Sequence, residues 1–357
     1  MDYIGSKAKL LDWMFGHISR HLAELGIDPK TSTFMDACAG SGAVSIYAAE
    51  YGFQEIVATD LLSFPAHIIH GKLGLDVSRN DEANEHIRRM NNLDPLHGFF
   101  SEHYSSEDTE DTEDPEKRLY FTLKNGHCID ACRAYIDTVT DPVMRSFLLC
   151  CLLEALSRVC NTAGVHGAFL KKFKERAREE FTVKNESISE AHPKCRVFNQ
   201  DILTLLENRS EDIQEDVLYI DPPYTERQYA PNYHLYETLV LADDPQIRGK
   251  TGLRDWESAK STFCSKSDIE DFFWRVLKAS KAKLVVVSYS SDGLLSLGEL
   301  ESLLMDALRV DVVEVQSRLQ KRFKADNSRQ NRQDTLREYL LFAPRPDPDV
   351  VWDLWDG

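Results

Sequence analysis

The spacing of hydrophobic positions in the first sixty residues changes from the period of a helix to short apolar runs. Residues 7–25 carry apolar side chains on one side of a predicted amphipathic helix: Leu10, Leu11, Met14, Ile18 and Leu22. Residues 33–38 predict a strand entering a glycine turn, residues 44–51 a helix, and residues 55–60 a second strand. This order is typical of the opening of a doubly wound α/β sheet.

The middle of the chain follows a different pattern, which is mostly helical from residue 65 to residue 193. It contains an acidic run at residues 107–116, interpreted as a solvated loop, and a strongly apolar helix at residues 142–156. Strand patterns then resume at residues 195–198, 217–220, 284–288, 310–315 and 338–342. The pattern predicts one α/β domain, residues 1–64 and 194–357, interrupted by a helical insertion at residues 65–193.

Charge and composition narrow the class of protein. The chain has 357 residues, 42% of them hydrophobic, and a formal net charge of −17, since 59 acidic residues outnumber 42 basic ones. Two basic segments stand out against this background: residues 171–178, with five positive charges and one negative, and residues 318–333, with six and one. A local basic patch suffices to contact phosphate groups, so nucleic acid remains a possible partner. Each segment has an alternative interpretation as a solvated charged face.

Other classes are excluded by what the chain lacks. No apolar run is long enough to span a bilayer, and residues 1–7 do not resemble a signal peptide, so we expect a cytoplasmic protein without a membrane partner. Eight cysteines are too dilute for a disulfide framework. Cys128 and Cys132 lie four residues apart beside His127, but no second paired set follows, so we expect no metal site.

The glycine turn after the first strand is the first candidate for a binding site. Asp36-Ala37-Cys38-Ala39-Gly40-Ser41-Gly42 lacks the third glycine of the dinucleotide fingerprint and the Gly-Lys-Ser/Thr of a phosphate loop. Glycines there let a ligand approach the backbone at the carboxyl edge of a sheet. Asp60, at the end of the next strand, is placed to accept both hydroxyls of a ribose.

The second candidate, Asp221-Pro222-Pro223-Tyr224, follows an apolar strand directly and is more specific. Two prolines hold the chain extended and donate no hydrogen bonds. The Asp221 carboxylate and a proline carbonyl thus become fixed acceptors beside an aromatic ring. Such an arrangement suits a planar group that bears an NH2.

Taken together, these motifs resemble the DNA adenine methylase family, the alpha-group amino-methyltransferases that use S-adenosylmethionine. The matching segments run in the family's order: Tyr3-Ile4-Gly5-Ser6-Lys7, residues 34–42, Asp60, Asn199-Gln200-Asp201 and Asp221–Tyr224. Three further segments, residues 118–122, 161–172 and 227–234, resemble methylases of restriction–modification systems. The resemblance implies a Rossmann-like sheet of the class I methyltransferase type, with the insertion as target-recognition region.

The resemblance also implies roles for individual residues. The catalytic set is Asp221, Pro222, Pro223 and Tyr224. The set that binds S-adenosylmethionine is Tyr3, Lys7, Asp36, Ala37, Gly40, Gly42, Asp60, Asp201 and Asp221. The residues expected to contact the flipped base or the DNA are Tyr224, Tyr229, Tyr233, Lys171, Lys172, Lys321, Arg322 and Lys324. Tyr229 and Tyr233 are equally compatible with a place in the core.

The predicted activity is site-specific methyl transfer from S-adenosylmethionine to the exocyclic amino group of adenine in double-stranded DNA. A restriction–modification system with a companion endonuclease is the expected setting. Three alternatives stay open from the sequence: cytosine amino methylation, methylation of structured RNA, and a degenerate module that binds nucleic acid without catalysis. The aspartate at position 221 favours adenine, and the intact glycine turn and Asp221–Tyr224 motif argue against degeneracy.

Overall fold

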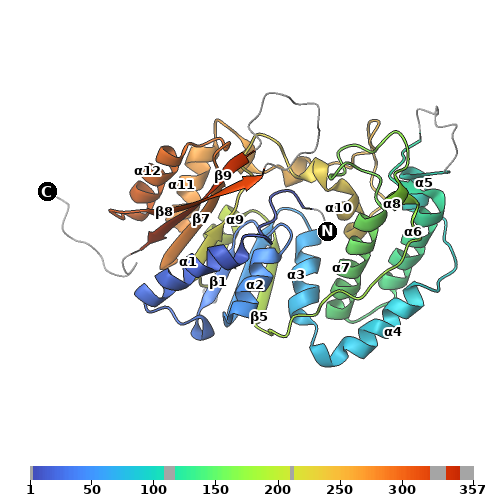
Figure 1. Ribbon diagram of the computed structural model, residues 1–357, viewed down its shortest axis with the longest axis horizontal. Coiled ribbons are helices and arrows are strands. Elements are labelled where there is room, and N and C mark those ends of the chain that lie inside the picture. Colours follow the sequence, from blue (N-terminus) through green and yellow to red (C-terminus); the bar gives the residue numbers. More distant parts are fainter. Residues whose placement is uncertain (1–2, 108–116, 210–212, 322–334, 346–357) are drawn as a thin grey trace.

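A seven-stranded sheet forms the centre of the computed structural model, which describes residues 3–107, 117–209, 213–321 and 335–345 (Figure 1). Its strand order is β5-β2-β1-β6-β7-β9-β8. The strands are β1 Thr33–Asp36, β2 Glu55–Asp60, β5 Lys194–Asn199, β6 Val217–Ile220, β7 Leu284–Ser290, β8 Glu314–Lys321 and β9 Thr335–Pro344. The first five run parallel to one another, whereas β9 runs antiparallel to β7 and to β8.

Both faces of this sheet are buried, because apolar side chains alternate between two separate cores. Along β6, for example, Val217 and Tyr219 join one cluster while Leu218 and Ile220 join the other. The first cluster packs against α1 Leu11–Glu24, α2 Ala43–Tyr51 and part of α3 Phe64–Gly74. The second packs against α9 Ile202–Asn208, α11 Ile269–Ala279 and α12 Leu297–Leu308. The sequence-based prediction of a doubly wound α/β fold is confirmed.

A helical lobe lies beside the sheet, at the right of Figure 1, with α5 and α6 farther from the sheet than α3 and α7. Its helices are α3, α4 Asn80–Met90, α5 Phe99–His103, α6 Leu123–Asp137, α7 Pro142–Val159, α8 Glu175–Arg178 and α10 His234–Leu241. The core centres on α7, in which twelve side chains are buried. The same core includes Leu235, Tyr236 and Leu239 of α10, so it draws on residues beyond the predicted insertion at 65–193.

Several short elements complete the described chain. The two-residue strands β3 Ser105–Ser106 and β4 Phe121–Thr122 pair in parallel within the helical lobe. The 3₁₀ turns are η1 Pro29–Thr31, η2 Val77–Arg79, η3 Ala230–Asn232, η4 Glu257–Ala259 and η5 Thr262–Cys264. Residues 108–116, most of the acidic run at 107–116, lie outside the described residues.

One predicted strand begins in the wrong place. The sequence pattern predicts a strand from Val310 to Val315, but β8 begins at Glu314. Helix α12 ends at Leu308 and is capped by Arg309 in the left-handed conformation, so the chain turns before it can pair with β9. Val312 is 69% exposed in this turn, which shows that its hydrophobicity does not report burial.

Candidate active site

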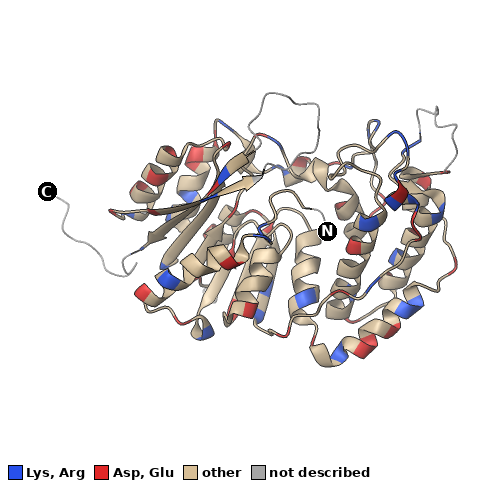
Figure 2. Ribbon diagram, viewed as in Figure 1, with Lys and Arg blue, Asp and Glu red and all other residues tan. Residues whose placement is uncertain are grey.

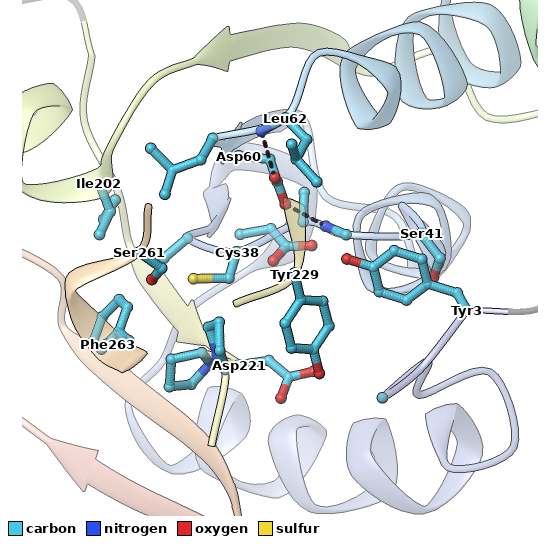
Figure 3. Close-up of a pocket in the computed structure, with 18 of the residues that line it drawn as sticks. Tyr3, Cys38, Ser41, Asp60, Leu62, Ile202, Asp221, Tyr229, Ser261 and Phe263 are labelled. Carbon is cyan, nitrogen blue, oxygen red and sulfur yellow. Dashed lines mark hydrogen bonds between the residues drawn. The ribbon is translucent and has the colours of Figure 1, made fainter. Parts of the chain in front are cut away.

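A pocket opens at the carboxyl edge of the parallel strands, where the chain leaves β1, β2 and β6 and where β5 leads into α9 (Figure 3). The N-terminal segment, residues 3–7, forms one wall. Residues 228–230 and parts of 259–263 form another. Segments far apart in the sequence therefore meet where open α/β sheets bind their ligands.

The glycine turn after β1 forms the floor of the pocket. Gly40 and Gly42 have φ angles of +50° and +74°, a region that side-chain-bearing residues rarely adopt. A Cβ on Gly40 would lie 2.9 Å from the Tyr3 ring, and one on Gly42 would lie 2.9 Å from Ile69. Both positions therefore favour glycine for two reasons: the backbone has a positive φ angle, and a side chain would clash with a neighbouring residue. Ala37 and Gly40 line the pocket, whereas Gly42 caps the start of α2.

Asp60 stands at the end of β2 with its carboxylate held by two backbone amides. Gly40 N donates to Oδ2 at 2.8 Å and Leu62 N donates to Oδ1 at 2.9 Å, the two dashed contacts in Figure 3. Burial raises the pKa of Asp60 to about 6, although these backbone bonds oppose the rise. The carboxylate is therefore fixed in place and faces the pocket.

Asp36 lies at the end of β1 and lines the same pocket. Ser45 donates to its Oδ2 at 2.7 Å, but its buried Oδ1 has no hydrogen-bond partner in the described structure. Burial raises the pKa of Asp36 to about 7, and the nearby Asp221 and Asp60 carboxylates add to that rise. An unpaired buried acceptor is costly, so this oxygen is suited to a cationic or hydrogen-bond-donating ligand group.

Asp221-Pro222-Pro223-Tyr224 follows β6, and all four residues line the pocket. The Lys7 ammonium lies 2.8 Å from Asp221 Oδ1 and 2.7 Å from Oδ2, and the Tyr224 hydroxyl donates to Oδ1 at 2.6 Å. Burial raises the pKa of Asp221, while Lys7 opposes that rise. Burial also lowers the pKa of Lys7, but Asp221 and Glu338 outweigh it and leave that pKa above its ordinary value.

Besides Tyr224, three tyrosines are predicted from the sequence, and they have different surroundings. Tyr3 and Tyr229 line the pocket, and Tyr229 is drawn between Asp60 and Asp221 in Figure 3. Tyr233 is fully buried, stacks on Tyr3 with ring centroids 4.6 Å apart, and its hydroxyl accepts from Ile4 N at 2.6 Å. In this conformation it holds the N-terminal wall in place and does not line the pocket. Its contact with a flipped base stays a prediction.

The remaining predicted residues lie in three settings. Asp201 lines the pocket and caps α9, accepting from Leu203 N at 2.8 Å. Lys171 and Lys172 are exposed in the loop between α7 and α8. Lys321 is the last residue of β8, while Arg322 and Lys324 lie outside the described residues.

Sequence reasoning missed four residues that the fold brings to the site. Gln228, Ser261 and Phe263 line the pocket, and Gln228 joins the two segments of the second wall through reciprocal bonds with the Ser261 backbone, of 2.8 and 3.1 Å. Glu338 of β9 contacts Tyr224 and Lys7. The available signal for Glu338 was a carboxylate at the start of the apolar run predicted as a strand at residues 338–342.

Two other kinds of feature are absent from the described parts of the chain. There, no cluster of three or more His, Cys, Asp or Glu side chains is arranged to hold a metal ion. No helix in those same ranges is long and apolar enough to cross a membrane.

Comparison with known proteins adds a family to this geometry. Residues 3–303 match the model of the D12 class N6 adenine-specific DNA methyltransferase family. Type II methyltransferase M.NlaIII of Neisseria lactamica is 32% identical, covering 95% of this chain and 98% of the relative. Type II methyltransferase M.CviAII of Paramecium bursaria Chlorella virus 1 is 33% identical, covering 96% and 98%.

A longer relative matches over only part of its length. Type II methyltransferase M.FokI of Planomicrobium okeanokoites is 29% identical over 97% of this chain but only 53% of its own. The family match spans both the glycine turn and the Asp221–Tyr224 motif, and it specifies adenine in DNA rather than the cytosine or RNA alternatives. With the described sheet, pocket and motif order in agreement, this chain belongs to the D12 class N6 adenine-specific DNA methyltransferases.

Proposed function

We propose that Asp221 and the Pro222 carbonyl hold the exocyclic amino group of a target adenine during its N6 methylation. The observation that carries this assignment is the position of the Asp221–Tyr224 motif at the end of β6. The motif lies beside Lys7 and lines the same pocket as Asp60. The acceptors, an aromatic ring and a ligand pocket therefore share one site. The enzyme acts on DNA and uses S-adenosylmethionine, as its family does.

The pocket residues fit S-adenosylmethionine on chemical grounds. Asp60 presents a fixed carboxylate to the hydroxyls of a ribose. The unpaired Asp36 Oδ1 suits an ammonium group, and the Gly40 turn leaves room for close approach to the backbone. We assign Tyr3, Lys7, Ala37, Asp201 and Gly42 to the walls and supports of this same cofactor site. When bound, the cofactor supplies an electrophilic methyl group on a positively charged sulfur.

The contribution of the protein is to make a poor nucleophile reactive. The lone pair of an adenine amino group is delocalised into the ring. When Asp221 and the Pro222 carbonyl accept its two hydrogens, they favour pyramidal geometry at nitrogen and localise that lone pair. The same acceptors stabilise the positive charge that develops on nitrogen. Prolines 222 and 223 keep these acceptors aligned, and alignment supplies much of the remaining acceleration.

The target base must leave the duplex to reach this pocket. Tyr224 and Tyr229 present aromatic rings there for stacking. We propose that the catalytic domain comprises residues 1–64 and 194–357, and that residues 65–193 carry target recognition with α10 packed into their core. We propose that two groups of basic residues contact phosphates: Lys171 with Lys172, and Lys321 with Arg322 and Lys324.

The biological setting follows from the relatives. M.NlaIII and M.CviAII are named type II methyltransferases, the modification enzymes of restriction–modification systems. We propose that this enzyme protects its recognition sites against a companion endonuclease. Expression in a methylation-free host, followed by mapping of modified adenines, measures base, strand and site together. Absence of any modified adenine there would support the degenerate nucleic-acid-binding alternative instead.

The assignment of Asp221 has a direct test. Asp221→Ala should reduce methyl transfer by at least roughly a hundredfold, since a preorganised acceptor is removed at the point where charge develops. Cofactor affinity, measured by calorimetry, should change far less. Asp81→Ala, an exposed position on α4, serves as the matched control. Turnover by Asp221→Ala close to that of the unmodified enzyme would contradict the proposed mechanism.

A further inference from the structure

The proposed role of Asp221 raises a difficulty, because both of its carboxylate oxygens are already engaged. The Lys7 ammonium contacts both oxygens, at 2.8 and 2.7 Å, and the Tyr224 hydroxyl donates to Oδ1 at 2.6 Å. These are charge-assisted bonds of the strong kind. An aspartate held in this way keeps a free lone pair but is a weaker acceptor for a neutral amino group, so loosening of these contacts would strengthen its bond to the amino hydrogen.

Glu338 lies within reach of both donors, the Lys7 ammonium and the Tyr224 hydroxyl. Its Oε1 accepts from Ser288 Oγ at 2.7 Å and from the Tyr224 hydroxyl at 2.9 Å, and it stands 3.4 Å from the Lys7 ammonium. The Tyr224 hydroxyl thus lies within hydrogen-bond distance of both carboxylates, and its single proton can be donated to either one but not to both at once. Lys7 needs a shift of well under about 1 Å to reach the usual hydrogen-bond distance from Glu338.

The position of Glu338 is unusual for a structural residue. The residue is 7% exposed, and the Lys7 side chain is 4% exposed, so two carboxylates share one ammonium away from bulk water. Burial of a second carboxylate carries a large cost unless it is paired. Ser288, on the neighbouring strand β7, fixes that carboxylate in its place. Glu338 also lies beyond residue 303, where the match to the family model ends.

We propose that Glu338 is a positioning residue that takes over Lys7 and Tyr224 when Asp221 turns to the target amino group. In the resting arrangement Lys7 and Tyr224 neutralise and orient Asp221. When the amino hydrogens arrive, the ammonium moves to Glu338, the tyrosine turns its single hydroxyl proton from Asp221 to Glu338, and the Asp221 oxygens become available. The proposal rests on the proposed function, since it assigns the residue that frees Asp221 for its role.

Two variants separate charge from shape. Glu338→Gln keeps the Oε1 acceptor for Ser288 and Tyr224 but removes the charge that would attract Lys7. Glu338→Asp keeps the charge but shortens the side chain. We expect single-turnover methylation rates in the order Glu, Asp, Gln, with Glu338→Gln slower than the unmodified enzyme by roughly tenfold or more, as expected for removal of a charged partner. Cofactor affinity and melting temperature should stay close to the unmodified values.

A double variant tests whether Glu338 acts through Lys7. In a Lys7→Met background no ammonium competes for Asp221, so adding Glu338→Gln should slow transfer by less than about twofold further. Glu314→Gln on β8, whose partners are Arg20 and His21, is the matched control and should leave all rates unchanged. If Glu338→Gln slows transfer by the same factor in the Lys7→Met background as in the unmodified enzyme, the proposal is overturned.

The remaining outcomes are equally decisive. A wild-type rate for Glu338→Gln, or a Gln variant faster than the Asp variant, shows that the charge is not needed. A rate that falls only together with melting temperature or cofactor affinity identifies a structural residue. If Asp221→Ala is inactive and Glu338→Gln is not slowed, the proposed function stands and only this inference fails. If Asp221→Ala is active, the proposed function itself fails.

Discussion

Asp60 illustrates how a single residue type at a strand end becomes a binding group. The sequence places an acid after β2, and the structure fixes its two oxygens against Gly40 N and Leu62 N. Those backbone bonds stabilise the ionised form, whereas burial favours the neutral form, and the balance raises the pKa to about 6. The charge available to the cofactor therefore depends on pH near neutrality.

At this residue we expect cofactor affinity to fall as pH decreases through about 6. The sign follows from the ribose hydroxyls, which donate to the ionised carboxylate, so protonation of Asp60 removes the stronger acceptor. Asp36, with a pKa of about 7, should add to the same trend. Asp60→Asn should weaken binding about tenfold or more at pH 8 and flatten the dependence near pH 6.

Calorimetric titration of the cofactor from pH 5 to pH 9 checks this expectation. The control is Glu270→Gln, which removes a carboxylate from an exposed position of α11. An unchanged affinity for Asp60→Asn at pH 8 would remove Asp60 from the cofactor site.

The sequence predicted the positions of some site residues but not of others. Asp60 and Asp221 follow apolar strands directly, and parallel strands bring their carboxyl ends to one edge, so their proximity is predictable. Glu338 was not, because β9 is antiparallel and only the finished sheet shows that its first half lies at that edge. Tyr233 shows the opposite problem: its stacking on Tyr3 depends on packing that the motif does not encode.

At the scale of elements, the glycine turn between β1 and α2 allows a comparison of two glycines. Gly40→Ala places a Cβ in the left-handed region, at a cost of about 1–2 kcal/mol, and 2.9 Å from the Tyr3 ring. Gly16, in α1, has no atom within 4 Å of an added Cβ. Gly16→Ala should therefore stabilise the protein by about 0.5–1 kcal/mol, through better helix propensity.

Chemical denaturation and cofactor titration separate these effects. Gly40→Ala should lower both the free energy of unfolding and the cofactor affinity, because Tyr3 must move within the pocket wall. Gly16→Ala should raise the free energy of unfolding and leave the cofactor affinity unchanged. Equal cofactor affinity in all three proteins would show that the turn is needed for folding alone.

Among the elements themselves, the buried strands were the easiest to predict. The residues of β6 and β2 coincide with the predicted runs, because strands buried on both faces are continuously apolar. The beginning of β8 was missed, since an edge strand carries polar residues and its start depends on where β9 can pair. Helix α10 joined the core of the helical lobe although it lies far from residues 65–193 in the sequence.

At the scale of the whole molecule, the charge distribution must reconcile a net charge of −17 with a polyanionic substrate. Lysine and arginine residues are scattered along the ribbon of both lobes, with acidic residues among them (Figure 2). The loop that carries Lys171 and Lys172 is held by two hydrogen bonds: Asn161 Nδ2 donates to the Lys172 carbonyl, and His166 N donates to the carbonyl of Asn232, the last residue of η3. The two exposed lysines therefore lie on a loop that is bonded to η3, whose first residue, Ala230, lines the pocket.

We therefore expect DNA affinity to depend on a few lysines rather than on overall charge. Changing Lys171 and Lys172 together to glutamine should weaken binding to specific and nonspecific duplexes alike. It should also reduce the dependence of log affinity on log salt by about one unit for each phosphate group that the variant no longer neutralises.

The matched control is the pair Lys30 and Lys283, exposed positions that precede β1 and β7 and so lie at the opposite edge of the sheet. Since both pairs change the net charge equally, a similar drop in affinity in both would mean that only total charge matters. A drop confined to one target sequence would instead assign Lys171 and Lys172 to base recognition, and unchanged affinity for the Lys171 and Lys172 variant would leave phosphate contact to other residues, such as Lys321 of β8.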